Sequence, residues 1–312
     1  MEKDIQKKSA ITKKTIIDKI FKRFFMTVCI LCAAVIVMIV VFIVIKGVQP
    51  FFKEYVMNGK TYKLSFIEFL FGNKWNFAPN HYGAGYIIIN TVYITILSLF
   101  IAVPISVFSS LFIVRIAPKR IGKALQTIIE LLASVPSIIY GLFGQAFITK
   151  IVMNVSNIFN IQTLGGQSVI TTAFVLGIMI FPTITMVSIN SIKAVKDDII
   201  LGSLALGASM TQTNFNVVLK GAKNGIFSGI VLGIGRALGE ATAVSKVCGN
   251  AQIGPTFSLF DTTSTITTTI LSGFNEASGM SYDVKFSLGV ILIILIIITN
   301  IVLNYIKKRV GN

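Results

Sequence analysis

Long apolar runs recur along the chain, and charged residues stand at their ends. Residues 24–45 and 286–306 contain no charged side chain. Four further stretches of similar character lie between them, at residues 87–114, 124–149, 169–192 and 225–247. A helix of about 20 apolar residues crosses a bilayer, because it satisfies its backbone polar groups without water. The pattern predicts an all-α integral membrane protein with six transmembrane helices.

The third of these stretches contains a proline and several hydroxyl side chains. We interpret Pro136, with Ser134, Ser137 and Tyr140 around it, as a packing kink inside one continuous span. The alternative is a local opening of the backbone toward a pathway, since a proline frees a carbonyl that hydroxyls can satisfy. Glu130, near the cytoplasmic end of the same stretch, is interpreted as structural.

Composition agrees with the hydrophobic pattern. Hydrophobic residues make up 54% of 312 positions and charged residues 13%, which is more apolar than one soluble core requires. The first apolar run is too long for the core of a signal peptide and lacks a small-residue cleavage site, so we expect it to be a retained helix. One histidine and three cysteines argue against a metal site, and buried packing is expected for Cys29 and Cys32.

The net charge of +16 is distributed unevenly between the two sides of the membrane. If the six spans alternate, one side receives 19 of the 28 Lys and Arg residues. The positive-inside rule then places both termini in the cytoplasm, so nucleic acid is not needed to explain the charge, and the basic amino terminus suits anionic lipid headgroups. The resulting organisation is a basic segment (1–23), a first span (24–45), an outer segment (46–86), a core (87–306) with a cytoplasmic segment (191–223) and an outer loop (249–283), and a tail (307–312).

The cytoplasmic segment 191–223 is more than a polar linker. Asp197 or Asp198 is expected to cap an amphipathic helix that runs to Leu206 and ends at Gly207. A second short helix is expected through Phe215 and its apolar neighbours. Two such helices either dock on a partner protein or lie at the membrane surface without one.

This segment resembles the cytoplasmic coupling loop of binding-protein-dependent ABC permeases. That loop has a Glu-Ala-Ala triplet, then three residues and a glycine, then nine residues and an Ile-x-Leu-Pro sequence. The chain fits the spacing, but Leu201 replaces the acidic residue and Lys220 replaces the proline. The resemblance implies that these positions contact an ATPase: Leu201, Gly202, Ser203, Leu206, Gly207, Ala208, Val217 and Leu219.

Four other segments resemble the PstA and PstC pair of phosphate permeases. They are residues 134–141 (SVPSIIYG), 181–184 (FPTI), 204–208 (LALGA) and 235–240 (GRALGE). The outer segment 69–79 and the pair Gly249-Asn250 look more like the PstC-type member.

The resemblance implies a type I ABC importer permease in the membrane of a bacterial or archaeal cell. Its implied partners are a PstA-type permease, PstB-type ATPase subunits that bind ATP and Mg, and an outer PstS-type phosphate-binding protein. The chain itself is expected to be no enzyme and to hold no nucleotide or other cofactor, because Glu54 stands where a phosphate loop before Lys60-Thr61 needs its first glycine.

The fifth predicted span carries a small-residue stripe and two charges. Gly225, Gly229 and Gly233 recur every four residues, which allows another helix to approach closely. Arg236 and Glu240 follow near the same face, and charges in mid-membrane are costly and favour a functional role. We hypothesise that Arg236 binds an oxyanion through its guanidinium fork while Glu240 neutralises it in the empty pathway. The alternative is a permanent ion pair that fixes helix packing.

Three functional alternatives remain open from sequence. A permease for sulfate or molybdate would use the same charge complementarity. A secondary transporter would need internal repeats that are not evident, and a membrane-embedded enzyme would need catalytic groups that the sequence scarcely provides. The polar outer loop 249–283 either caps the outer mouth as a re-entrant helix or is a solvated loop.

Overall fold

The computed structural model describes residues 2–57, 59–76 and 82–311. Within these residues, six helical segments are long and apolar enough to cross a membrane, as the sequence predicts. The six segments are Ile17–Phe52, Gly85–Ile116, Ser137–Ile158, Val169–Lys193, Met210–Gly239 and Met280–Arg309.

Over the described residues, the elements are helices and one outer hairpin. The helices are α1 (Glu2–Phe52), α2 (Phe66–Phe71), α3 (Gly85–Leu111), α4 (Lys119–Ser134), α5 (Ser137–Phe143), α6 (Thr149–Ile158), α7 (Val169–Lys193), α8 (Asp197–Ala205), α9 (Met210–Gln212), α10 (Leu219–Gly239), α11 (Thr242–Ser245), α12 (Ile266–Leu271) and α13 (Met280–Gly311). Three π-helical turns join neighbours: η1 (Phe112–Ile116), η2 (Gly144–Ile148) and η3 (Thr213–Val218). The hairpin is antiparallel and consists of β1 (Tyr55–Met57) and β2 (Lys60–Tyr62).

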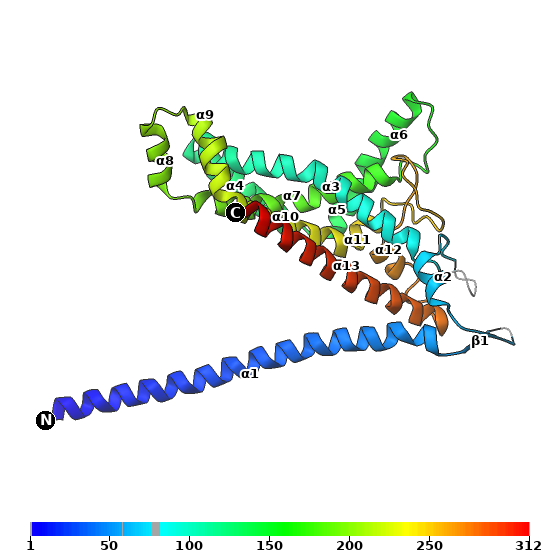
Figure 1. Cartoon of the computed structure of the whole chain (residues 1–312), viewed down its shortest axis with the longest axis horizontal. Coiled ribbons are helices and arrows are strands. Elements are labelled where there is room, and N and C mark those ends of the chain that lie inside the picture. The colour runs from blue at the N-terminus through cyan, green and yellow to red at the C-terminus, as the bar shows by residue number, and fades with distance from the viewer. Residues whose placement is uncertain (1, 58, 77–81, 312) are drawn as a thin grey trace.

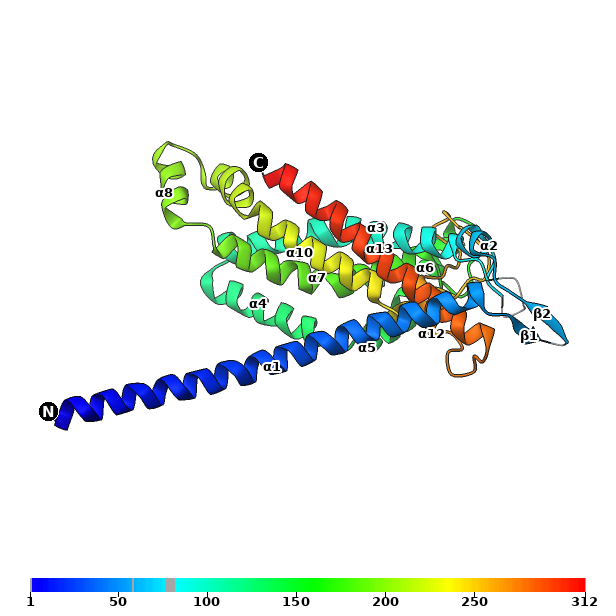
Figure 2. The same ribbon diagram turned by 60° about the horizontal axis from the view of Figure 1, so that its bottom comes forward.

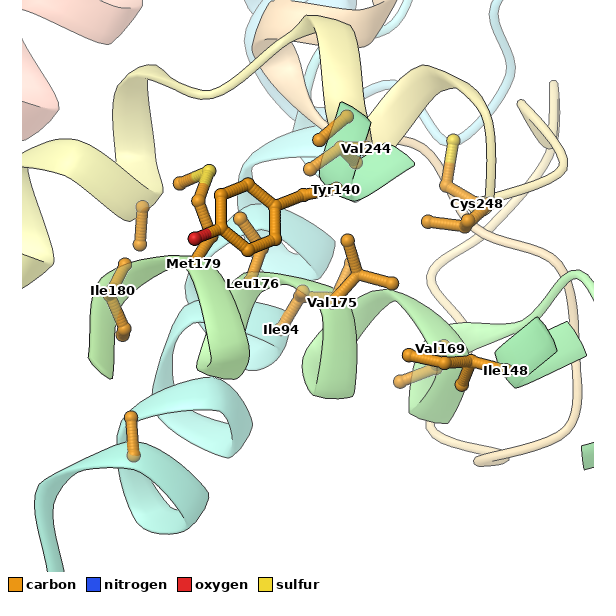
Figure 3. Packing of buried hydrophobic residues seen from close by; sticks show 14 of the residues in the cluster. Ile94, Tyr140, Ile148, Val169, Val175, Leu176, Met179, Ile180, Val244 and Cys248 are labelled. Atoms are coloured by element: carbon orange, nitrogen blue, oxygen red, sulfur yellow. The ribbon is translucent and has the colours of Figure 1, made fainter. Parts of the chain in front are cut away.

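Helices α3, α7 and α10 form the centre of the bundle (Figures 1 and 2). The buried core lies on α7, where Leu176, Met179 and Ile180 are almost fully enclosed. Tyr140 from α5, Met179 and Leu176 from α7, and Val244 from α11 belong to one buried cluster (Figure 3). Burial of such side chains contributes about 1.5–3 kcal/mol each, so this cluster fixes α5 and α11 against α7.

Helix α1 packs on α13 near its outer end and diverges from the bundle toward the amino terminus (Figures 1 and 2). The contact is close at Gly47, where an added Cβ would lie 2.7 Å from the carbonyl oxygen of Phe286. Toward the amino terminus, the α1 residues from Ile17 to Phe42 are exposed. The expectation of buried packing for Cys29 and Cys32 is therefore wrong for this chain alone, because both lie on the exposed part of α1.

The third span differs from the prediction of one helix over residues 124–149. The chain leaves helical geometry at Val135 and Pro136, and the span consists of α5, η2 and α6 over Ser137–Ile158. Helix α4 is a separate amphipathic helix beside α7. The hydroxyl of Tyr140 donates to the carbonyl oxygen of Leu132 at 2.7 Å, which satisfies a group at the end of α4. Pro136 thus marks a break between two helices and not a kink in one.

The outer end of the bundle carries the hairpin, α2 and α12, opposite the end that holds both termini and α8 (Figure 1). The threonine-rich part of the outer loop is not solvated, since Thr263, Thr265, Thr267 and Thr268 are buried. Thr265 begins α12 with a capping box, in which its side chain accepts from the Thr268 amide at 3.3 Å. The hydroxyls of Thr265, Thr267 and Thr268 are paired with one another, whereas the buried Thr263 hydroxyl has no hydrogen-bond partner among the described residues.

Candidate functional site

Arg236 lies in the last turn of α10 and is half-buried. Its guanidinium donates a hydrogen bond of 2.8 Å to the hydroxyl of Thr183 on α7. Thr183 follows Pro182, which cannot donate a backbone hydrogen bond and so loosens the turn around it. The side chain of Arg236 is thereby oriented by α7, a partner that lies 53 residues earlier in the chain.

The segment 134–141 also lies near Arg236. Tyr140 of α5 lies within electrostatic range of Arg236. Its neighbour Gly141 packs so closely on α11 that an added Cβ would lie 2.8 Å from Cα of Ala243. Three short motifs that are distant in sequence, at residues 134–141, 181–184 and 235–240, therefore converge around one guanidinium.

Glu240 is placed differently from the sequence expectation. Helix α10 ends at Gly239, and Glu240 has an extended backbone with φ −79° and ψ 118°. Its carboxylate accepts a hydrogen bond of 2.9 Å from the Ala243 amide, and its carbonyl accepts one of 2.7 Å from Thr267. The fifth predicted span over residues 225–247 is therefore corrected to a helix that ends at Gly239.

The structure does not bring Arg236 and Glu240 into contact. Neither side chain forms an ion pair within 4.0 Å with a described residue, whereas Lys46 and Asp283 pair at 3.7 Å. Because α10 ends at Gly239, Glu240 does not continue the helical face on which Arg236 lies. The alternative of a permanent Arg236–Glu240 ion pair is therefore wrong for this conformation, and so is the expected neutralisation of Arg236 by direct contact with Glu240.

The glycine stripe of α10 faces α7. An added Cβ at Gly233 would lie 2.8 Å from the Ile184 side chain, and one at Gly229 would lie 3.1 Å from Cβ of Val187. At Gly225 it would overlap the side chain of Ser191. These glycines allow α10 to approach α7 closely, and this approach places Arg236 within reach of Thr183.

The cytoplasmic segment forms α8, a turn and a helix that continues into the fifth span. Helix α8 begins after Lys196, so Asp197 and Asp198 occupy its first turn and are not its cap, contrary to the prediction. Gly207 has φ +85° and ends the helical region, as expected for a residue that tolerates the left-handed conformation. The expected second short helix is not separate, because α9, η3 and α10 follow without a break.

The residues assigned to coupling form an exposed apolar tip on this segment. Leu206 is 91% exposed and Leu201 is 61% exposed, and an added Cβ at Gly202 would meet nothing within 4 Å. Behind the tip, the hydroxyls of Ser203 and Thr213 lie 3.0 Å apart and tie α8 to η3. Ala208, Val217 and Leu219 are half-buried.

The sequence pattern did not identify Thr183 as the partner of Arg236. The available signal was the Phe-Pro-Thr-Ile motif itself, since a hydroxyl beside a helical proline is well placed to bond a neighbouring helix. The sequence pattern also did not identify Lys285 of α13 as a buried cation, because a lysine at the edge of a span normally extends toward water.

Comparison with known proteins places the chain in a family of transport subunits. Residues 102–312 match the family described as the binding-protein-dependent transport system inner membrane component, and the chain belongs to it. It is an ABC importer permease and a multi-pass protein of the plasma membrane. Members of this family are not enzymes themselves and work with separate ATPase and substrate-binding proteins.

Two relatives show how far the similarity extends. The probable ABC transporter permease protein YqgH of Bacillus subtilis is 33% identical over 298 residues, which cover 94% of this chain and 92% of that protein. The phosphate transport system permease protein PstC of Pasteurella multocida is 36% identical over 250 residues, covering 76% of this chain and 77% of that one. The resemblance to PstC-type permeases stated from the motifs is confirmed.

Solved structures of similar shape agree on the fold. A bacterial ABC transporter that imports the polysaccharide alginate has a chain with a TM-score of 0.59 and 16% identity, and the match covers 94% of this chain and 99% of that one. The MetNI methionine transporter in an inward-facing conformation matches with a TM-score of 0.53 and 18% identity over 73% of this chain and 94% of that one. The fold is that of a type I ABC importer permease.

Proposed function

We propose that this chain is the PstC-type permease subunit of an ATP-driven phosphate importer and forms half of its translocation pathway. The observation that carries the proposal is the position of Arg236. Its guanidinium is oriented by Thr183 and, among the described residues, forms no ion pair with a carboxylate. A guanidinium fork binds tetrahedral oxyanions through paired hydrogen bonds, so this group suits a passing phosphate.

The half-buried position of Arg236 adds a physical argument. A charge at this depth in a membrane protein costs at least a few kcal/mol unless it meets water, protein dipoles or a counter-ion. A single hydroxyl compensates only part of that cost. Arg236 therefore gains most when an anion enters the pathway, while Glu240, which is engaged with the Ala243 amide, remains a nearby negative charge that prevents the anion from binding too tightly.

The proposed partners follow from the same function. A PstA-type permease completes the pathway, a PstS-type protein delivers phosphate from outside, and PstB-type subunits bind ATP and Mg. We assign the exposed apolar tip at Leu201, Leu206 and their neighbours to the contact with the ATPase. Exposed leucines on a short helix suit insertion into a groove of a partner.

The test is ATP-dependent uptake of labelled phosphate into proteoliposomes that contain this chain, its partner permease, the ATPase and the binding protein. Sulfate and molybdate serve as competitors. Uptake that requires this chain and ignores both competitors supports the phosphate assignment, and competition broadens it to other oxyanions.

Two substitutions test the role of Arg236 in the same vesicles. Arg236→Gln removes the charge and Arg236→Lys keeps it without the fork, whereas Lys246→Gln removes an exposed charge ten residues further on as a matched control. Wild-type uptake in an assembled Arg236→Gln complex would contradict the role of Arg236.

A further inference from the structure

Lys285 is a buried cation that the proposed pathway does not use. It lies on α13 and is only 1% exposed. Its ammonium group donates to the carbonyl oxygen of Ile270 at 3.3 Å and to that of Ser272. The ring of Phe274 lies 5.8 Å from the same nitrogen.

Both carbonyls belong to the carboxyl end of the short helix α12. The last carbonyls of a helix have no partner within it and carry its negative dipole end, so a cation there is favourable. Donation by Lys285 thus attaches the end of α12 to the last span.

The other parts of α12 are attached to two further elements. The amide of Ile266 donates to the hydroxyl of Thr91 on α3 at 3.0 Å. The hydroxyl of Thr267 donates to the carbonyl of Glu240 at 2.7 Å, at the break that follows α10. Helix α12 therefore connects α13 to the backbone four residues beyond Arg236.

A pocket of about 400 Å³ lies along this connection. Ala241 from the break, Thr267 and Ile270 from α12, and Glu276 from the following turn line it. Because α12 supplies one wall, any displacement of α12 changes the shape of this pocket and the position of the break together.

We propose that Lys285 is a positioning residue that holds α12 against the break after α10 and so fixes the outer part of the pathway beside Arg236. This inference rests on the proposed transport function. A six-residue helix cannot hold its own position in the membrane, since isolated helices shorter than about 12 residues are marginal. The donors that fix its two ends therefore decide where it lies.

The experiment compares Lys285→Met with Lys150→Met, which removes an exposed lysine in the third span, in the complete complex in nanodiscs. Hydrogen exchange of residues 264–272 is expected to be about tenfold faster in Lys285→Met than in the control, because the opening of α12 becomes easier. The maximal rate of ATP-driven uptake is expected to fall about tenfold, because a displaced α12 distorts the pathway. The KM is expected to stay unchanged, because the binding protein still delivers phosphate. Lys285→Arg, which keeps the donors and the charge, should recover both.

A double-mutant comparison with Thr267→Val tests the connection directly. If α12 transmits the effect, the losses caused by Lys285→Met and Thr267→Val are not additive. If Lys285→Met does not assemble, Lys285→Gln, which removes the charge and shortens the side chain, takes its place, and the same faster exchange of residues 264–272 is expected.

Equal exchange of residues 264–272 in Lys285→Met and the Lys150→Met control would overturn the inference, as would faster exchange with an unchanged uptake rate. The exchange measurement needs no transported solute. A wild-type complex that does not take up phosphate would contradict the proposed function alone, and the exchange result would still decide whether Lys285 positions α12.

Discussion

Arg236 of α10 and Thr183 of α7 are joined by a hydrogen bond of 2.8 Å between guanidinium and hydroxyl. The bond holds a charged group in one orientation at the point where α10 ends. It also connects two short motifs that lie more than 50 residues apart in the sequence.

Removal of this hydroxyl should impair transport without unfolding the protein. Thr183→Val keeps the volume of the side chain but leaves the guanidinium without its partner, and a hydrogen bond to a charged group contributes about 1.5–3 kcal/mol. We expect phosphate uptake to fall about tenfold, as measured in proteoliposomes. Thr185→Val is the matched control, because its hydroxyl bonds only the Phe181 carbonyl of its own helix. Equal rates for the two variants would show that the bond does not orient Arg236 for transport.

A side chain at position 233 should destabilise the protein, because α10 contacts α7 closely at Gly233. Gly233→Val places atoms against Ile184, where even a Cβ would lie at 2.8 Å. Overpacking of this kind costs about 1–3 kcal/mol, so the thermal unfolding temperature of the purified chain in detergent should fall. Gly235→Ala is the control, since an added Cβ there meets nothing within 4 Å and alanine favours a helix by about 1 kcal/mol. A Gly233→Val variant as stable as Gly235→Ala would mean that α7 and α10 do not pack as described.

The apolar tip should be required for assembly with the ATPase. Leu206→Asp introduces a charge at a position that is 91% exposed in this chain, so the subunit itself should remain as stable as the wild type. Loss of an anchoring side chain costs an interface about 2 kcal/mol or more, so co-purification with the ATPase should fall at least about thirtyfold. Asn157→Asp, at the exposed outer end of α6, controls for the added charge. Normal co-purification of the Leu206 variant would show that Leu206 is not part of the contact with the ATPase.

Because of Cys248, the stability of the chain should fall as pH rises in the alkaline range. Burial raises the pKa of its thiol to about 11. In the unfolded chain the thiol loses its proton near its ordinary pKa of 9.0, so between these values the unfolded state binds fewer protons and stability falls as pH rises. The loss should reach about 2 kcal/mol by pH 11.

Thermal unfolding at a series of pH values from 8 to 11 measures this effect, with Cys248→Ala as the reference. Other groups titrate in the same range in both proteins, so the difference between the two curves isolates the thiol. Parallel curves would show that the thiol of Cys248 is not held in its neutral form by burial.

The sequence by itself determined the membrane topology and the family. Uncharged runs of about 20 residues have one stable solution in lipid, and the distribution of Lys and Arg orients them. The segment around Leu201 and Gly207 was also sufficient to predict an exposed helix that ends at Gly207, because a helix and its glycine end depend on local chemistry.

Helix breaks and side-chain partners were decided by tertiary structure. A hydrophobic run does not reveal where it stops being helical, so α4 was joined to α5 across Pro136, and α10 was extended past Gly239. In both places groups from other parts of the chain, Tyr140 at Leu132 and Thr267 at Glu240, bond the carbonyls that a break exposes.

The partners of Arg236 and Lys285 illustrate the same limit. Periodicity placed Arg236 and Glu240 on one helical face, but the break after Gly239 separates them and leaves Thr183 to bind the guanidinium. The cost of a buried charge requires compensation without specifying which group supplies it. That choice depends on distances between helices, which the packing of Gly229 and Gly233 on α7 sets and which no pattern along a single helix contains.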